Sequence, residues 1–329
     1  MSRKLVTVFG ATGNQGGSVA SLLLRDGALR AKYAVRVVTR DSSKPAAKEL
    51  EKLGAELAQA DLKDVASVSA AIKGSYAVFG VTNYWESMSS DKEVQQGKNI
   101  VDASVKEGVK HLVWSSLPNA TLVSGGQLVH VQHFDGKAAV QAYAEESKKN
   151  AKDLWTTYFM PAYFLSNLKT SIVPGQQGVP TWNAPFDAER TNVPVIDINA
   201  DTGKFVAGIL EAGQEADGVQ VQGVSQWASP SEIVQTFNDA IGKQVAFNQI
   251  PLDIFKSFLP PAVADELGEN MVLIGDYDYY GKGTREKQAQ SDRFLYRGAD
   301  CQLLKPHASS NQITKKQKFF QNRRASSGT

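Results

Sequence analysis

The chain has 329 residues, of which 42% are hydrophobic and 21% charged, a composition typical of a globular protein with a large core. Its formal net charge is +2. Because residues 305–329 hold six Lys and Arg and no Asp or Glu, the rest is mildly acidic, which excludes direct binding of nucleic acid. No stretch is apolar enough over a sufficient length to span a membrane. The single cysteine, Cys301, excludes an internal disulfide and favours a cytoplasmic location.

The first half of the chain alternates strands with helices. Apolar, β-branched runs predict strands at 5–9, 34–39, 55–60, 76–82 and 111–116. Helical spacing of apolar residues predicts helices at 17–27, 44–54, 65–74 and 92–108. This alternation is typical of an α/β protein with a doubly wound parallel sheet, a Rossmann-type fold.

The second half predicts a mixture of elements. Helices are expected at 134–147, 201–213 and 229–242, and strands at 154–160, 193–198, 218–225 and 244–250. Residues 171–192, rich in Pro, Gly and Asn, predict a loop.

Three units are therefore expected. A Rossmann domain covers 1–155, and the strand and helix near 193–213 return to it. A smaller C-terminal α/β domain covers 156–300. The basic tail, 301–329, is expected to be disordered because it is polar with few apolar residues.

Glycines at positions 10, 13 and 16 stand between the first strand and the first helix, in the stretch Gly10-Ala11-Thr12-Gly13-Asn14-Gln15-Gly16. In that context glycines permit a tight turn, a close approach of backbone to a pyrophosphate, and close packing of helix on strand. The helix end adds unpaired N–H groups. The sequence therefore predicts a dinucleotide site, although the spacing is GxxGxxG rather than GxGxxG.

Charged residues near the ends of the next two strands indicate which dinucleotide. Arg40 follows the second strand and Lys44 lies four residues later, and an arginine there can hold a 2′-phosphate. This favours NADP(H), with NAD(H) second, and Asp41 is the alternative acidic partner for a free ribose. Asp61 ends the third strand, where it can meet the adenine amino group or cap the following helix.

The tyrosine of short-chain reductases is missing. These enzymes use a Tyr-x-x-x-Lys pair for proton transfer, but no tyrosine of this chain has a lysine four residues later. Lys137 stands where that lysine is expected, and His133 lies four residues before it. A histidine can transfer a proton near neutral pH; the alternative is that His133 has only a packing role. Ser115 and Ser116, at the end of the fifth strand, could polarise a carbonyl. The histidines and the cysteine show no metal-ligand spacing, so no metal is expected.

The segments VFGATGNQGGSV, VRVVTRDSSKPAAKEL, VTNYWES, HFDGK and PAYFLSNL resemble the NmrA-like proteins, an atypical branch of the short-chain dehydrogenase superfamily, over about residues 4–285. The resemblance implies an NAD(P)-binding protein without the catalytic tyrosine, of a kind that includes redox sensors and transcriptional co-regulators. It implies cofactor contacts from Gly10 to Gly16 and from Arg40, Lys44, Asp61, Leu62, Thr82, Asn83, Tyr84, Lys137, Pro161, Ala162, Tyr163 and Phe164.

The chain departs from the family pattern from about Asp292 onward. The segment KKQKFFQNRR resembles a nuclear-import patch and RRAS a kinase site at Ser326; the alternative is an unselected tail. The favoured hypothesis is an NADP(H)-binding sensor acting on a protein partner such as a transcription factor, in the cytoplasm and also the nucleus, with a homodimer as one arrangement. The alternative is an NADPH-dependent reductase of the isoflavone-reductase-like kind, using Lys137 with or without His133.

Overall fold

The computed structural model describes residues 2–175, 178–242 and 244–298. Its largest feature is a seven-stranded sheet in the order β11-β6-β5-β4-β1-β2-β3, in which every pair of neighbours is parallel. The strands are β1 (Lys4–Val8), β2 (Tyr33–Thr39), β3 (Glu56–Gln59), β4 (Ala77–Gly80), β5 (His111–Ser115), β6 (Trp155–Pro161) and β11 (Gln220–Gly223). The predicted Rossmann-type α/β fold is confirmed.

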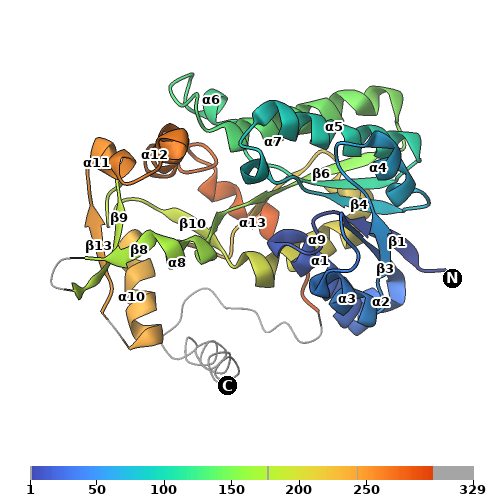
Figure 1. Ribbon diagram of the computed structural model, residues 1–329, viewed down its shortest axis with the longest axis horizontal. Helices are drawn as coiled ribbons and strands as arrows, with labels where there is room; N and C mark the ends of the chain where they lie inside the picture. Colours follow the sequence, from blue (N-terminus) through green and yellow to red (C-terminus); the bar gives the residue numbers. More distant parts are fainter. Residues whose placement is uncertain (1, 176–177, 243, 299–329) are drawn as a thin grey trace.

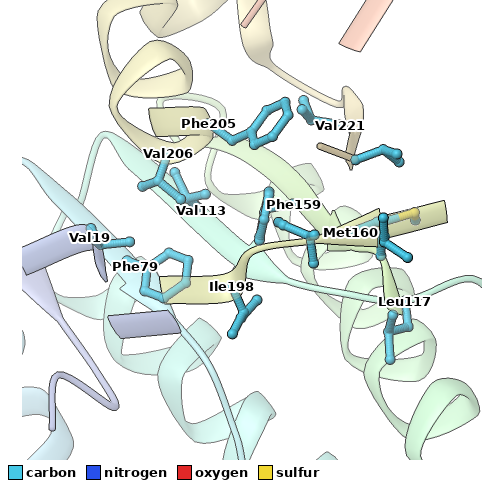
Figure 2. Close-up of a cluster of buried hydrophobic side chains, with 14 of the residues drawn as sticks. Val19, Phe79, Val113, Leu117, Phe159, Met160, Ile198, Phe205, Val206 and Val221 are labelled. Atoms are coloured by element: carbon cyan, nitrogen blue, oxygen red, sulfur yellow. The ribbon is translucent and has the colours of Figure 1, made fainter. Parts of the chain in front are cut away.

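Helices cover both faces of this sheet (Figure 1). One face packs on α1 (Asn14–Arg25), α2 (Gly27–Lys32), α3 (Pro45–Lys52) and α9 (Ile198–Ala212). The other packs on α4 (Val65–Ile72), α5 (Ser90–Lys106) and α7 (Gln132–Ser147). Figure 2 shows the first of these layers, where Val19 of α1 and Phe205 and Val206 of α9 lie over Phe79 and Phe159 of the strands. All five side chains are at most 2% exposed, so this layer forms a closed core.

A second region lies at the left of Figure 1, away from the N-terminus. It contains two three-stranded sheets, ordered β12-β10-β7 and β13-β9-β8. Their strands are β7 (Tyr163–Phe164), β10 (Val193–Ile196), β12 (Gln226–Ala228), β8 (Ile172–Pro174), β9 (Pro180–Ala184) and β13 (Ala246–Gln249). Helices α8 (Leu168–Ser171), α10 (Pro230–Ile241), α11 (Leu252–Ser257) and α12 (Pro261–Asp276) accompany them.

The remaining elements are short. They are α6 (Ala120–Val123), α13 (Gln288–Asp292) and the 3₁₀ turns η1 (Tyr84–Glu86), η2 (Lys148–Asn150), η3 (Leu165–Asn167), η5 (Gly213–Ala216) and η6 (Arg285–Lys287). Local sequence explains several helix starts. Ser229 and Glu232 form a reciprocal capping box at the start of α10, and the side chain of Asp197 caps α9.

The structure differs from three expectations about the second half. The strand near 193 does not return to the Rossmann sheet: β10 pairs with β7 and β12, whereas the helix that follows it, α9, does pack on the large sheet. The stretch expected to be a loop, 171–192, contains β8 and β9. Strands β6 and β11, beyond the expected boundary at 155, belong to the large sheet. The basic tail, with Cys301 and Ser326, lies outside the described residues.

Candidate functional site

The turn between β1 and α1 is built from glycines that leave no room for side chains. Gly10 has a φ of +61°, and a Cβ there would lie 2.7 Å from Cγ1 of Val81. A Cβ on Gly16 would lie 2.4 Å from the carbonyl oxygen of Phe9 and 2.5 Å from that of Gly10. Because those oxygens belong to the backbone, they cannot move aside. The turn therefore offers bare backbone to a ligand at the end of β1.

Helix α1 begins at this turn without a capping side chain. Its N-cap is Gly13, no side chain caps it, and its first turn contains no acidic residue. The first N–H groups of a helix have no partner within the helix, and the helix dipole makes this end positive. A 12-residue helix that begins in this way is suited to bind a phosphate.

A cavity of about 460 Å³ extends from the glycine turn across the carboxyl ends of the neighbouring strands, within the usual size range of ligand sites. The expected site residues that line it are Gly10, Thr12, Gly13, Asn14, Gln15, Gly16, Arg40, Lys44, Asp61, Leu62, Thr82, Asn83 and Phe164. The lining also includes residues that the sequence did not single out: Phe9, Val38, Thr39, Ala60, Lys63, Val81, Glu86 and Gln96. The structure thus gathers segments spread over 155 residues around one cavity.

Two cations, Arg40 and Lys44, lie on the wall of the cavity beyond β2. Arg40 forms an ion pair with Glu86 of η1, which also lines the cavity. Asp41 is not among the lining residues. Hydrogen bonds from the hydroxyl and the backbone N–H of Ser43 lower the pKa of its carboxyl group. The position next to β2 therefore presents an arginine rather than an acid to the cavity, and that arginine is held by Glu86.

Asp61 does not cap the helix that follows it. Helix α4 is capped by Asp64, whose side chain accepts a hydrogen bond from Ala66 N at 3.0 Å. Asp61 lines the cavity and accepts a hydrogen bond from Lys63 N at 2.9 Å. The position of Asp61 in the cavity lining therefore fits contact with a ligand better than capping of the following helix.

Lys137 is buried behind the cavity wall and is not among the lining residues. Its Nζ donates to Oε1 of Glu93, to the Thr82 hydroxyl at 3.1 Å and to the Thr82 carbonyl at 3.3 Å. Glu93 is 1% exposed, and its Oε1 also accepts from the Thr82 hydroxyl at 2.8 Å. The ammonium of Lys137 thus has three oxygen partners, which is its full donor capacity.

His133 is also bound to a buried carboxylate. Its Nδ1 lies 2.7 Å from Oε1 of Glu266 on α12, and its backbone N–H donates to the same oxygen at 2.9 Å. The hydroxyl of Tyr84 donates to the other oxygen, Oε2, at 2.6 Å. Burial opposes ionisation of Glu266, but these hydrogen bonds outweigh it and lower the pKa of the carboxyl group. Burial and the bond to Glu266 raise the pKa of Tyr84. The three side chains form one network, none of whose members lines the cavity.

The remaining expected residues surround the cavity without lining it. Of segment 161–164 only Phe164 lines the cavity, while Pro161 offers its carbonyl to the hydroxyl of Tyr279 at 3.0 Å. The other expected residues outside the lining are Ala11, Ala162 and Tyr163. At the end of β5, Ser115 donates to Oε1 of Gln15 at 2.7 Å, next to the glycine turn.

Sequence reasoning missed the acidic partners Glu86, Glu93 and Glu266. Their partners Arg40, Lys137 and His133 lie 46, 44 and 133 residues away in the chain. Spacing along the chain carries no signal for such pairs. The described residues contain no group of three or more His, Cys, Asp and Glu arranged to hold a metal, and no described helix has the length and apolar character to cross a bilayer.

The parallel sheet, the glycine turn and the uncapped helix define a Rossmann-type protein with the architecture of a dinucleotide site. The sequence model of the NmrA-like family matches residues 2–307. The chain therefore belongs to the NmrA-like family, and the match runs past Asp292, where the resemblance was expected to end.

Curated relatives and solved structures agree with this assignment. The NmrA-like family domain-containing oxidoreductase ptmS of Penicillium ochrochloron is 33% identical over 272 residues, covering 78% of each chain. The similarly named hkm9 of Aspergillus hancockii is 31% identical over 343 aligned positions, covering 96% of this chain and 97% of its own. The crystal structure of NmrA, a negative transcriptional regulator in complex with NAD, superimposes with a TM-score of 0.74 at 20% identity over 89% of this chain and 91% of its own. The NADPH-dependent quinone oxidoreductase QOR2 of Escherichia coli gives 0.67 at 17% identity over 96% and 100%.

Proposed function

We propose that the chain binds NADP(H) in the cavity, with NAD(H) as the weaker ligand. The pyrophosphate would lie at the start of α1, against the glycine turn. Arg40 and Lys44 would face the 2′-phosphate, and Asp61 the adenine. Two observations support this proposal. A Cβ at Gly10 or Gly16 would clash with neighbouring atoms, so the glycines leave the backbone of the turn open to a ligand. Two cations lie on the wall of the same cavity. NmrA has been crystallised with NAD and with NADP, which agrees with a site of this kind.

We further propose that the cofactor is a signal here rather than a consumed reagent, so that the protein is a redox sensor or co-regulator. One observation carries this: both candidate proton donors are bound to buried carboxylates, Lys137 to Glu93 and His133 to Glu266, and neither lines the cavity. When NADPH is bound it supplies a hydride donor. A substrate that accepts the hydride would also need a proton from the protein. Lys137 uses its three N–H donors on Glu93 and Thr82, and Nδ1 of His133 is bound to Glu266, so both side chains are held away from the cavity.

The turn η1 offers a route from the cofactor to a partner surface. Glu86 at one end is paired with Arg40 on the cavity wall, while Tyr84 at the other end is bound to Glu266 of α12. A 2′-phosphate that takes over Arg40 would release Glu86 and bias the position of η1. The proposed partner is a protein such as a transcription factor. A second copy of the chain and a nuclear as well as cytoplasmic location belong to the same proposal.

A second candidate is an NADPH-dependent reductase that uses Lys137. It is supported by the printed names of the curated relatives, which call them oxidoreductases. It is also supported by position, because Thr82, which binds Lys137 Nζ, does line the cavity. For this role the ammonium would have to leave Glu93 and turn toward the cavity when the cofactor binds.

Two measurements separate these functions. Titration calorimetry with NADP and NAD tests binding, and Arg40→Ala should weaken NADP much more than NAD. NADPH oxidation is then followed at saturating cofactor against a panel of carbonyls and quinones. Binding without turnover supports the sensor, whereas turnover that Lys137→Ala abolishes supports the reductase. Failure to bind either dinucleotide would refute both.

A further inference from the structure

A second cavity lies apart from the dinucleotide site. Its volume is about 540 Å³, and it shares no lining residue with the first. Its lining residues come from β11 and the end of β6, from the segment after β5, and from η6 and α13. Its apolar lining includes Leu122, Met160 and Tyr280, so the cavity can enclose a hydrocarbon or aromatic body.

The charges that line this cavity are all positive. Lys287 and Arg293 are its charged lining residues, and no acidic residue lines it. Within the described part of the chain neither cation has an ion pair. The guanidinium of Arg293 lies 4.7 Å from the ring centre of Phe294, which orients it without neutralising it. The wall therefore offers two uncompensated cations to whatever enters.

One lining residue carries a buried amide oxygen without a partner. Gln222 is 8% exposed and lines the cavity. Its backbone is satisfied: the N–H donates to Oγ of Ser291 at 2.9 Å, and the carbonyl accepts from Gln288 at 3.2 Å. Its side-chain Oε1 has no hydrogen bond. Because that oxygen is itself buried, it does not face the cavity, and recognition of a ligand there rests on the two cations and the apolar lining.

We propose that this cavity binds a small organic anion with an apolar body. The carboxylate, sulfonate or phosphate would pair with Lys287 and Arg293, and the body would contact Leu122 and Met160. This site does not depend on the proposed function of the first cavity.

The test uses 8-anilinonaphthalene-1-sulfonate, which has a sulfonate, two apolar ring systems and one N–H. Its fluorescence is titrated with the full chain, with and without saturating NADP. We expect one site that persists with NADP. Joint replacement Lys287→Gln and Arg293→Gln should weaken it at least about tenfold, since charge-assisted contacts are lost.

The matched control is Lys282→Gln, which removes an exposed lysine that does not line the cavity and should leave binding unchanged. Circular dichroism confirms that each variant is folded. The inference is overturned by any of three results: no stoichiometric probe binding, equal binding by the double variant, or complete displacement of the probe by NADP. If the chain binds the probe but not NADP, this inference stands while the proposed function fails. The experiment therefore distinguishes the failure of one proposal from the failure of the other.

Discussion

Replacing Glu86 by glutamine should tighten NADP binding and leave NAD binding unchanged. Glu86 lines the dinucleotide cavity and holds Arg40 in an ion pair. If Arg40 binds the 2′-phosphate, the carboxylate competes with the ligand for the same guanidinium and also repels it. The neutral amide of Glu86→Gln keeps the shape of the side chain and removes both effects.

The exposure of the two side chains sets the size of the effect. Arg40 is 61% and Glu86 48% exposed, and ion pairs of this kind contribute about 0–1 kcal/mol. Freeing Arg40 therefore strengthens NADP binding by at most about fivefold. Because exposed charges are screened, the gain should shrink when the salt concentration rises from about 0.01 M to about 0.15 M.

Titration calorimetry of both dinucleotides with both proteins measures this difference. The control variant is Glu49→Gln, which changes net charge equally. Glu49 is also exposed and also forms an ion pair, with Lys52, but it does not line the cavity. An equal gain for NAD and NADP, or the same gain with Glu49→Gln, would show a general charge effect and refute the argument. Weaker NADP binding by Glu86→Gln would show that the carboxylate itself supports the ligand.

Three further variants test other parts of the structure. Gly16→Ala should abolish dinucleotide binding and lower the free energy of unfolding by about 1–3 kcal/mol in urea denaturation; Gly27→Ala, whose Cβ meets nothing within 4 Å, should do neither. His111 is fully buried and its pKa is lowered from 6.5 to about 4, mainly by burial. As the pH falls from 7.5 to 5 the unfolded chain takes up this proton first, so about 2 kcal/mol of stability should be lost, and His111→Gln should show a smaller loss; an equal loss contradicts the assignment. Lys137→Met leaves the carboxylate of Glu93 buried and unpaired, so unfolding should become easier by about 3–5 kcal/mol, and the double variant with Glu93→Gln should recover part of it; no recovery would mean that the ion pair is not the cause.

The sequence predicts the large sheet well because its signal is local. Each strand from β1 to β6 is an apolar run between helical segments. Gly10 and Gly16 stand at positions where the backbone has no room for a Cβ, so the residue type itself indicates the turn. Pairing between distant strands has no such signal, so the runs containing β10 and β11 were each assigned to the wrong sheet. The Pro, Gly and Asn residues of 171–192 predict a loop, yet strands β8 and β9 within this stretch form a short antiparallel pair.

The candidate site divides in the same way. Residues that meet a ligand through the backbone or at a strand end were predicted from their place in the motif, and most of them line the cavity. Whether Lys137 and His133 are free to move a proton depends on Glu93 and Glu266. Those contacts arise from tertiary packing, which no local pattern encodes.

The layout of the large sheet also governs how the chain can be synthesised and divided. The apolar face of α1 is covered by α9, whose residues lie more than 170 positions later, and the outermost strand, β11, ends at Gly223. During synthesis the apolar face of α1 and one edge of the sheet therefore stay uncovered until about two thirds of the chain has left the ribosome. Exposed apolar surface and open strand edges promote aggregation during that period. A fragment cut at residue 155 would lack two strands and that covering helix. We therefore expect that the first 155 residues do not fold on their own.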